Sequence, residues 1–298
     1  MDWRRDGPGW PNHDRSRFVV ADGQRWFVQR WPPPAPGAPE LLLIHGTGAS
    51  SHSWRDLAPL LAQHAGVMAF DLPGHGFSAP ARGDGATLPG MARGVRALLA
   101  AMDAAPSVLV GHSAGAAIAV RMALDGAAGV RALVSLNGAL LPLHGLAGRV
   151  FSPLAKLLAL NPLVPRLFAW RAADPAALRR LIESTGSTLD AAGQALYRRL
   201  VTDPAHVAGA LAMMARWDLQ PLQSALPRLA TPLHLVVGEQ DRTVPPSNSE
   251  RVQRLLPATT VTSLHRLPGM GHLAHEERPP AVAAPLLRLL TDAHAPAP

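Results

Sequence analysis

The sequence predicts an α/β fold in which a mostly parallel central sheet has helices on both faces and carries one helical insert. Short apolar runs alternate along the chain with helical patterns, as expected of buried parallel strands joined by helices. Residues 139–226 break this alternation, because they contain helical patterns interrupted by prolines and no strand signal. A length of 298 residues is enough for one large domain with such an insert.

The first expected element is a β-hairpin. Residues 16–31, "SRFVVADGQRWFVQRW", contain two apolar-rich runs around Asp22 and Gly23, a residue pair that suits a hairpin turn. A proline-rich loop follows, and further strands are expected at 40–46, 67–76, 107–113, 131–138 and 233–241, with a last strand before the loop "LPGMGH". The chain then divides into a first core part (1–138), a helical insert (139–226) and a second core part (227–298) whose tail "DAHAPAP" is expected to be disordered.

Composition excludes several chemistries. The chain has no cysteine, which rules out disulfides, thiolate metal sites and a cysteine nucleophile. The only lysine, Lys156, lies in "PLAKLLAL", which is neither a P-loop nor a Schiff-base context. The net charge of +7 comes from scattered arginines, so a nucleic-acid partner is not expected. The N-terminus has no signal-peptide core and no apolar run is long enough for a membrane span, so we expect a soluble, cytoplasmic protein.

A serine interrupts the apolar run "LVGHSAGAAIAV" (109–120). Ser113 lies between Gly111 and Gly115 at the predicted junction of a strand and a helix. G-x-S-x-G in this context is typical of a nucleophile elbow, in which small neighbours let strand and helix approach closely. An ordinary tight strand-to-helix turn can need the same residues, so the interpretation depends on partners elsewhere in the chain.

Those partners follow in the order serine, acid, histidine. Asp241 ends the apolar strand "LHLVVGEQD", and His272 lies in the glycine-rich loop "LPGMGHLAHEERP". Each candidate comes just after a predicted strand, where open α/β sheets bind their ligands. We expect His272 to take the Ser113 proton as general base, with Asp241 fixing the imidazole tautomer.

His275 is a rival for the role of His272. Gly271 directly before His272 allows a tight approach, whereas Glu276 and Glu277 after His275 are typical of the start of a solvated helix. Both observations favour His272.

The loop "HGTGAS" (45–50) directly follows the first central strand. Its Thr47 N–H and the Ala114 N–H after the serine are the expected oxyanion-hole donors. The second loop of this kind, "DLPGHGFS", contains Asp71 and His75, which we expect to be structural. The 13 histidines lack an H-E-x-x-H arrangement, so neither a metal nor a cofactor is expected.

Taken in order, "HGTG", "DLPGHGFS", "GHSAG", "GEQD" and "GMGH" make the chain resemble the α/β-hydrolase superfamily across nearly its whole length. A closer resemblance, over roughly residues 10 to 290, is to the magnesium-chelatase accessory proteins of bacteriochlorophyll biosynthesis, the BchO type. It is carried by "HGTGASSHSWRDLAPLL", "GHSAGAAIAVRMALDG", "LNPLVPRLFAWRAADP", "ALAMMARWDL" and "GHLAHEERP". This resemblance implies an α/β-hydrolase fold with residues 139–226 as its lid, and a place in magnesium chelation.

Two functions remain open at this point. One is a serine hydrolase that cleaves an ester or related acyl bond of an apolar molecule, such as a tetrapyrrole intermediate. The other is a non-catalytic protein that binds a porphyrin or supports the chelatase and uses the fold as a pocket. Dehalogenase and epoxide-hydrolase chemistry would want aspartate at position 113 and is disfavoured, whereas a cofactor-free haloperoxidase-like reaction would use the same three residues.

The lid supplies the expected substrate-binding residues. Its apolar side chains form a large, adaptable set: Phe168, Trp170, Met213, Met214 and Trp217. Arg149, Lys156 and Arg166 interrupt the apolar lid sequence, a pattern compatible with a carboxylate-bearing macrocycle or with peripheral contact to a membrane surface.

Overall fold

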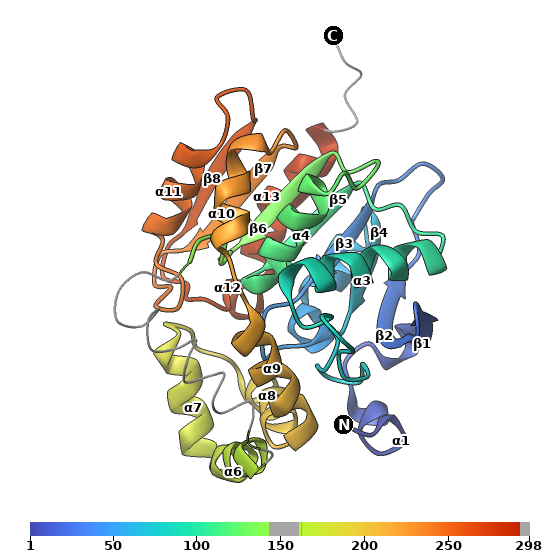
Figure 1. Ribbon diagram of the computed structural model, residues 1–298, viewed down its shortest axis with the longest axis vertical. Coiled ribbons are helices and arrows are strands. Elements are labelled where there is room, and N and C mark those ends of the chain that lie inside the picture. The colour runs from blue at the N-terminus through green and yellow to red at the C-terminus, as the bar shows by residue number, and fades with distance from the viewer. Residues whose placement is uncertain (143–160, 162, 293–298) are drawn as a thin grey trace.

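The computed structural model describes residues 1–142, 161 and 163–292 (Figure 1). The predicted disordered tail, together with Arg149 and Lys156, lies outside the described residues. The centre of the molecule is a sheet of eight strands in the order β1-β2-β4-β3-β5-β6-β7-β8. The strands are β1 (Ser16–Ala21), β2 (Gln24–Trp31), β3 (Glu40–Ile44), β4 (Gly66–Phe70), β5 (Val108–His112), β6 (Ala132–Leu136), β7 (Leu233–Gly238) and β8 (Thr262–Leu267).

The sheet is parallel from β4 to β8, while β2 is antiparallel to both β1 and β4. The predicted hairpin is confirmed as β1 and β2. Asp22 and Gly23 have φ values of 48° and 68°, the left-handed pair that a two-residue hairpin turn requires.

Two expected strands are clearly too long, because β7 ends at Gly238 rather than at Asp241 and β4 ends at Phe70 rather than at residue 76. The chain turns there because the Asp71 carboxylate accepts the Phe77 N–H at 2.8 Å and the Ser51 N–H at 2.7 Å. Gly74 and Gly76 within this turn have φ values of 79° and 50°. The loop thus folds back on Asp71.

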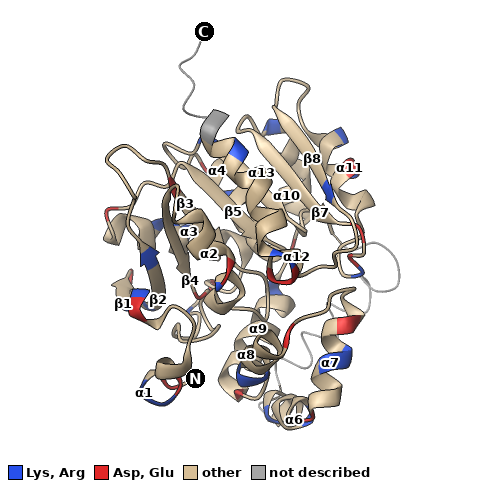
Figure 2. Cartoon of the chain, turned by 180° about the vertical axis from the view of Figure 1, so that it is seen from behind, with Lys and Arg blue, Asp and Glu red and all other residues tan. Residues whose placement is uncertain are grey.

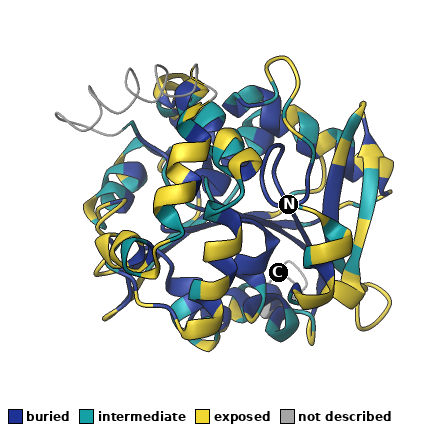
Figure 3. Cartoon of the chain, turned by 90° about the horizontal axis from the view of Figure 1, so that it is seen from below, coloured by how far each residue is buried: buried dark blue, intermediate teal, exposed yellow. Residues whose placement is uncertain are grey.

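Helices cover both faces of the sheet, and the buried residues concentrate on the strands and on the sides of the helices that face them (Figure 3). One face packs against α3 (Leu88–Ala101), α4 (Ala114–Leu124), α10 (Gln220–Ala225) and α11 (Ser247–Leu255). The other face packs against α2 (Leu57–Leu61) and α13 (Pro279–Asp292). Lysines and arginines are spread over many elements in the view of Figure 2, not gathered in one patch.

Four described helices of the insert form a layer at one end of the sheet (Figure 1). They are α6 (Leu163–Ala172), α7 (Pro175–Ser184), α8 (Ala191–Val201) and α9 (Pro204–Arg216). An aspartate precedes each of the last three, and its carboxylate accepts N–H groups of the first turn: Asp174, Asp190 and Asp203. The remaining short helices are α1 (Trp3–Asp6) and α12 (Ala274–Glu277). No helix in these described ranges is long and apolar enough to cross a bilayer.

Helix α4 lies unusually close to the strands beside it. A Cβ added at Gly115 would lie 2.1 Å from the Ile44 carbonyl oxygen, and one added at Gly111 would lie 2.3 Å from the Ala116 nitrogen. Both obstacles are backbone atoms, so the neighbours cannot yield by a rotamer change. Positions 111 and 115 therefore have room only for glycine.

We expect Gly115→Ala to lower the free energy of unfolding by about 2 kcal/mol, because the added methyl group overlaps strand backbone. Urea denaturation measures the change. Gly9→Ala is the matched control, since its Cβ would meet only the movable Arg199 guanidinium at 3.2 Å. Equal stabilities of the two variants would contradict the packing argument.

Candidate active site

Ser113 occupies the turn between β5 and α4. Its φ of 52° and ψ of −117° are strained for a residue with a side chain, which costs about 1–3 kcal/mol. Main-chain hydrogen bonds hold the turn: Ser113 N–H donates to the Leu136 carbonyl at 3.0 Å, and the Ser113 carbonyl accepts the N–H groups of Ala139 at 3.0 Å and Ala116 at 3.1 Å. The loop after β6 thus fixes the serine in this conformation.

Asp241 and His272 are in direct contact. His272 Nδ1 lies 2.8 Å from Asp241 Oδ2, and both residues are buried. Asp241 Oδ1 accepts the main-chain N–H groups of Thr243 and Val244 at 2.8 and 2.9 Å. A carboxylate only accepts hydrogen bonds, so the imidazole proton resides on Nδ1 and Nε2 is left as the basic nitrogen.

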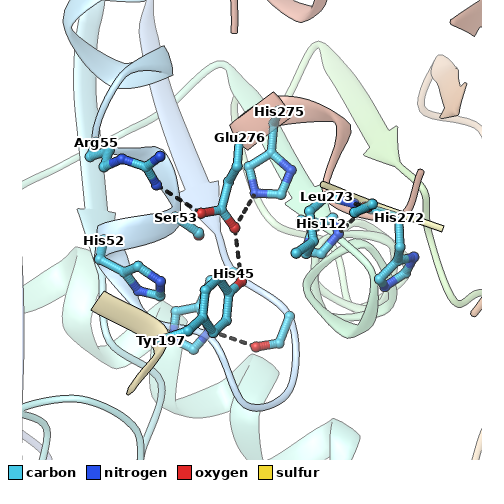
Figure 4. A network of polar contacts seen from close by, with 12 residues as sticks. His45, His52, Ser53, Arg55, His112, Tyr197, His272, Leu273, His275 and Glu276 are labelled. Atoms are coloured by element: carbon cyan, nitrogen blue, oxygen red, sulfur yellow. Dashed lines mark hydrogen bonds and ion pairs between the residues drawn. The ribbon is translucent and has the colours of Figure 1, made fainter. Parts of the chain in front are cut away.

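The histidine loop also contacts the residue before the serine. His112 Nε2–H donates to the His272 carbonyl at 2.9 Å, and the two rings lie 4.8 Å apart (Figure 4). Within the described chain, the Ser113 hydroxyl is not itself hydrogen-bonded to the imidazole. The structure therefore joins Asp241 to His272 directly, and it joins the residue before Ser113 to the His272 main chain. Such hydrogen bonds are often long before substrate binds.

The loop after β3 lies against the serine. A Cβ added at Gly46 would be 2.9 Å from Ser113 Cβ. The predicted donors, Thr47 N–H and Ala114 N–H, have no hydrogen-bond partner in the part of the chain that the structure describes. Two free main-chain donors beside a strained serine are the groups that an oxyanion needs.

Two buried histidines shape this loop. His45 Nδ1–H donates to the Gly46 carbonyl at 2.7 Å while its Nε2 accepts the Leu72 N–H at 2.8 Å. His206, on lid helix α9, donates from Nε2 to the Gly48 carbonyl at 3.1 Å and accepts the Gly76 N–H at 3.0 Å. Burial lowers the pKa of His45 to about 3 and that of His206 to about 4, so both remain neutral bridges.

The predicted lid residues differ in position. Met213 is fully buried and its Sδ accepts the Thr47 hydroxyl at 3.3 Å, so it touches the loop beside the serine. Met214 and Trp217 are partly buried. Phe168 and Trp170 lie on α6 with 49% and 73% of their surface exposed. A role in substrate binding stays a prediction for all five.

A buried carboxylate follows the histidine loop. Glu276 accepts hydrogen bonds from Arg55 at 2.9 Å and from the Tyr197 hydroxyl at 2.8 Å (Figure 4). Burial raises the pKa of Glu276 to about 7. The expectation that Glu276 begins a solvated helix is therefore wrong. Its carboxylate is buried and accepts hydrogen bonds from Arg55 and from Tyr197, which lies on helix α8 of the insert.

His275 does not take the place of His272. It is fully buried, and its ring lies 4.6 Å from Trp54 and 4.3 Å from His112. Among the described residues, neither of its ring nitrogens has a hydrogen-bond partner. Of these two histidines, it is His272 that contacts the Asp241 carboxylate.

Sequence reasoning missed four residues at this site: His112, Asn137, His206 and Glu276. His112 stands inside the elbow motif, so its place was visible but not its contact with residue 272. Asn137 donates to Asp241 Oδ2 at 2.8 Å from a loop far away in sequence, and no local pattern marks it. The same holds for His206, which lies in a helix otherwise typical of a lid.

The buried histidines predict that acid destabilises the protein. Burial lowers the pKa values of His45, His206 and His275 to about 3, 4 and 3, below the ordinary value of 6.5. At a pH between the folded and the unfolded pKa of such a histidine, the unfolded chain binds more protons than the folded chain. The free energy of unfolding therefore rises with pH and falls on acidification, by about 1.4 kcal/mol per pH unit for each histidine. Asp71 and Glu276 oppose this, because their pKa values are raised to about 6 and about 7.

We expect urea denaturation to show a free energy of unfolding that falls from pH 7.5 to 6 and to 5. In His206→Gln the dependence of this free energy on pH should be weaker, by an amount that corresponds to about one proton. His64→Gln is the control because His64 is exposed. A His206→Gln slope equal to that of the wild type would refute the assignment of a neutral, buried His206.

The model of the alpha/beta hydrolase fold family matches residues 39–279. A magnesium-chelatase 30 kDa subunit from Rhodobacter capsulatus is 41% identical over 277 residues, which cover 93% of this chain and 94% of the relative. A solved α/β hydrolase fold protein from Burkholderia ambifaria is 27% identical, with a TM-score of 0.75 over 92% of this chain and 98% of that one.

A solved membrane phospholipase A is 25% identical, with a TM-score of 0.73 over 94% of this chain and 87% of that one. The fold that the sequence predicts is thus confirmed by the sheet order, the family match and these structures. The chain belongs to the α/β-hydrolase fold family and, over nearly its whole length, resembles the BchO-type subunit associated with magnesium chelatase.

Proposed function

We propose that the protein is a serine hydrolase that acts on an ester or related acyl bond of an apolar molecule, as an accessory factor in magnesium chelation for bacteriochlorophyll biosynthesis. The observation that carries the proposal is the 2.8 Å contact between Asp241 and His272 beside a strained serine. The elbow glycines and the free N–H groups of Thr47 and Ala114 support it.

In the proposed reaction, Ser113 Oγ attacks the substrate carbonyl carbon and His272 Nε2 takes the hydroxyl proton. Asp241 stabilises the resulting imidazolium, and the N–H groups of Thr47 and Ala114 bind the oxyanion. The bond to the leaving alcohol then breaks, and the alcohol departs with the proton held by His272. Water attacks the acyl-serine by the same steps and releases the acid.

The pathway assignment rests on the chelatase relative. A subunit of that name in Rhodobacter capsulatus supports contact of this protein with the chelatase and a tetrapyrrole as the apolar substrate. We place the protein in the cytoplasm, with peripheral membrane contact through the lid. The exposed side chains of Leu163, Leu167 and Trp170 on α6 support that contact, since Arg166 and Arg171 flank them.

We expect a fluorophosphonate probe to label the wild-type protein covalently at Ser113, with fluoride as leaving group and the serine proton passing to His272. Ser113→Ala should lose labelling entirely, and His272→Ala should slow it by about a thousandfold or more, because the base is removed. Mass spectrometry of the labelled peptide measures both. His275→Ala is the control and should keep more activity than His272→Ala; folded wild-type protein that takes no label would overturn the proposal.

A non-catalytic role is the second candidate, and the name of the 41% identical relative favours it, since that name describes a chelatase subunit and not a hydrolase. In this role the protein would bind a porphyrin or support the chelatase without using Ser113. We expect cells that carry Ser113→Ala as their only copy to lose pigment synthesis if catalysis is needed. Full pigment synthesis by Ser113→Ala, together with saturable quenching of tryptophan fluorescence by a porphyrin, would establish the binding role instead.

A further inference from the structure

We propose that Asn137 is a positioning residue for the Asp241–His272 pair. The inference rests on the proposed function, in which Asp241 orients His272. Asn137 follows β6 directly and is buried, with 2% of its surface exposed. Its Nδ2 lies 2.8 Å from Asp241 Oδ2, the same oxygen that contacts His272 Nδ1.

The backbone presents the Asn137 amide to Asp241. Asn137 has a φ of 47°, in the left-handed region that asparagine tolerates better than most residues. Its N–H donates to the Val236 carbonyl at 2.9 Å, which ties residue 137 to β7, the strand that leads to Asp241. The left-handed turn and this bond together fix where the side chain lies.

The orientation of the amide follows from its partners. Nδ2 faces the Asp241 carboxylate and, at 3.4 Å, the Gly271 carbonyl, and both groups can only accept hydrogen bonds. Asn137 therefore bridges the acid and the residue directly before His272. One side chain from β6 holds both ends of the acid–histidine contact.

With Asn137 included, the carboxylate has a defined partner on every side. Oδ1 accepts the Thr243 and Val244 N–H groups, and Oδ2 accepts Asn137 and His272. Without the amide, Oδ2 would keep one donor instead of two. His272 would then be the one partner of Oδ2, and the charge of the carboxylate would be less shared by neutral donors.

An amide suits this position better than an acid. A carboxylate at 137 would face that of Asp241 at hydrogen-bond distance, and two such groups cannot both ionise without strong repulsion. Asparagine has nearly the same shape, donates instead of accepting, and carries no charge. The geometry thus explains why a neutral donor occupies the end of β6.

Other titratable groups also lie near the His272 imidazole. They are His112 on β5, His275 on α12, and Glu277, which accepts the Gly271 N–H at 2.9 Å. Burial lowers the pKa values of His112 and His275 far below neutrality, so both rings are uncharged at neutral pH. None of these groups is changed in the variants below.

The test is an NMR titration of the His272 imidazole in the wild type, Asn137→Ala and Asn137→Asp, with His272→Gln used to assign the signal. We expect the midpoint to rise by about 0.5 pH unit in Asn137→Ala, because a less shared carboxylate charge stabilises the imidazolium more strongly. Asn137→Asp should raise it further. The fluorophosphonate labelling rate of Asn137→Ala should fall about tenfold, the cost of one hydrogen bond to a charged group.

The matched control is Asn12→Ala. Asn12 is also left-handed, with a φ of 55°, and its Nδ2 donates to the Arg55 carbonyl at 3.1 Å, but it has no contact with Asp241 or His272 among the described residues. Even if Asn12→Ala lowers the stability of the protein, we expect its His272 titration midpoint and its labelling rate to match those of the wild type. An unmoved midpoint in Asn137→Ala would overturn the inference, even if labelling slowed. If the midpoint moves in Asn137→Ala but the wild-type protein takes no label, Asn137 remains the positioning residue and the hydrolase function is rejected.

Discussion

The site depends on the backbone contact between helix α4 and the ends of β3 and β5. Because Gly111 and Gly115 have no side chain, the helix begins directly against the strands. A Cβ added at Gly115 would lie only 2.1 Å from the Ile44 carbonyl oxygen, so no other residue fits there. This approach forces Ser113 into its strained turn and leaves the Ala114 N–H without a partner in the described chain. It also brings the loop of residues 45–50 against the serine. A single packing constraint therefore sets both the conformation of Ser113 and the free N–H group of Ala114 beside it.

The lid is built into this arrangement and does not merely cover it. His206 of α9 holds the Gly48 carbonyl, and Met213 of the same helix accepts the Thr47 hydroxyl. Tyr197 of α8 donates to Glu276, four residues after His272. A displacement of α9 or α8 would thus act on the loop that carries Thr47 or on the helix that follows the histidine. The positions of α8 and α9 and the geometry of the candidate site are therefore mechanically linked.

The sequence predicted what local backbone chemistry determines. The hairpin at Asp22 and Gly23, the positions of the parallel strands, and the strand-to-helix turn at Ser113 each follow from residues adjacent in the chain, and the structure contains all of them. The pairing of Asp241 with His272 was also accessible, because both residues lie in loops that follow neighbouring parallel strands, whose carboxyl ends meet at one edge of the sheet. Asn137, His206 and Glu276 were not, since each acts through a contact more than 70 residues away that no periodicity encodes. Glu276 was misjudged for the same reason: its sequence neighbourhood is polar, while Arg55 and Tyr197 bury it.

The many histidines around the site raise the question of which one can act as a base. Buried imidazoles of His45, His206 and His112 bind main-chain groups, and burial lowers the pKa of each, so a proton delivered there would be strongly disfavoured. Among the described residues, His272 is the one histidine hydrogen-bonded to a carboxylate. A proton arriving at its Nε2 creates an ion pair with Asp241, 2.8 Å away, whereas His45, His206 and His112 have only main-chain partners and the Glu276 carboxylate is 3.9 Å from His275. The surrounding neutral rings therefore leave His272 as the residue on which the serine proton can be held.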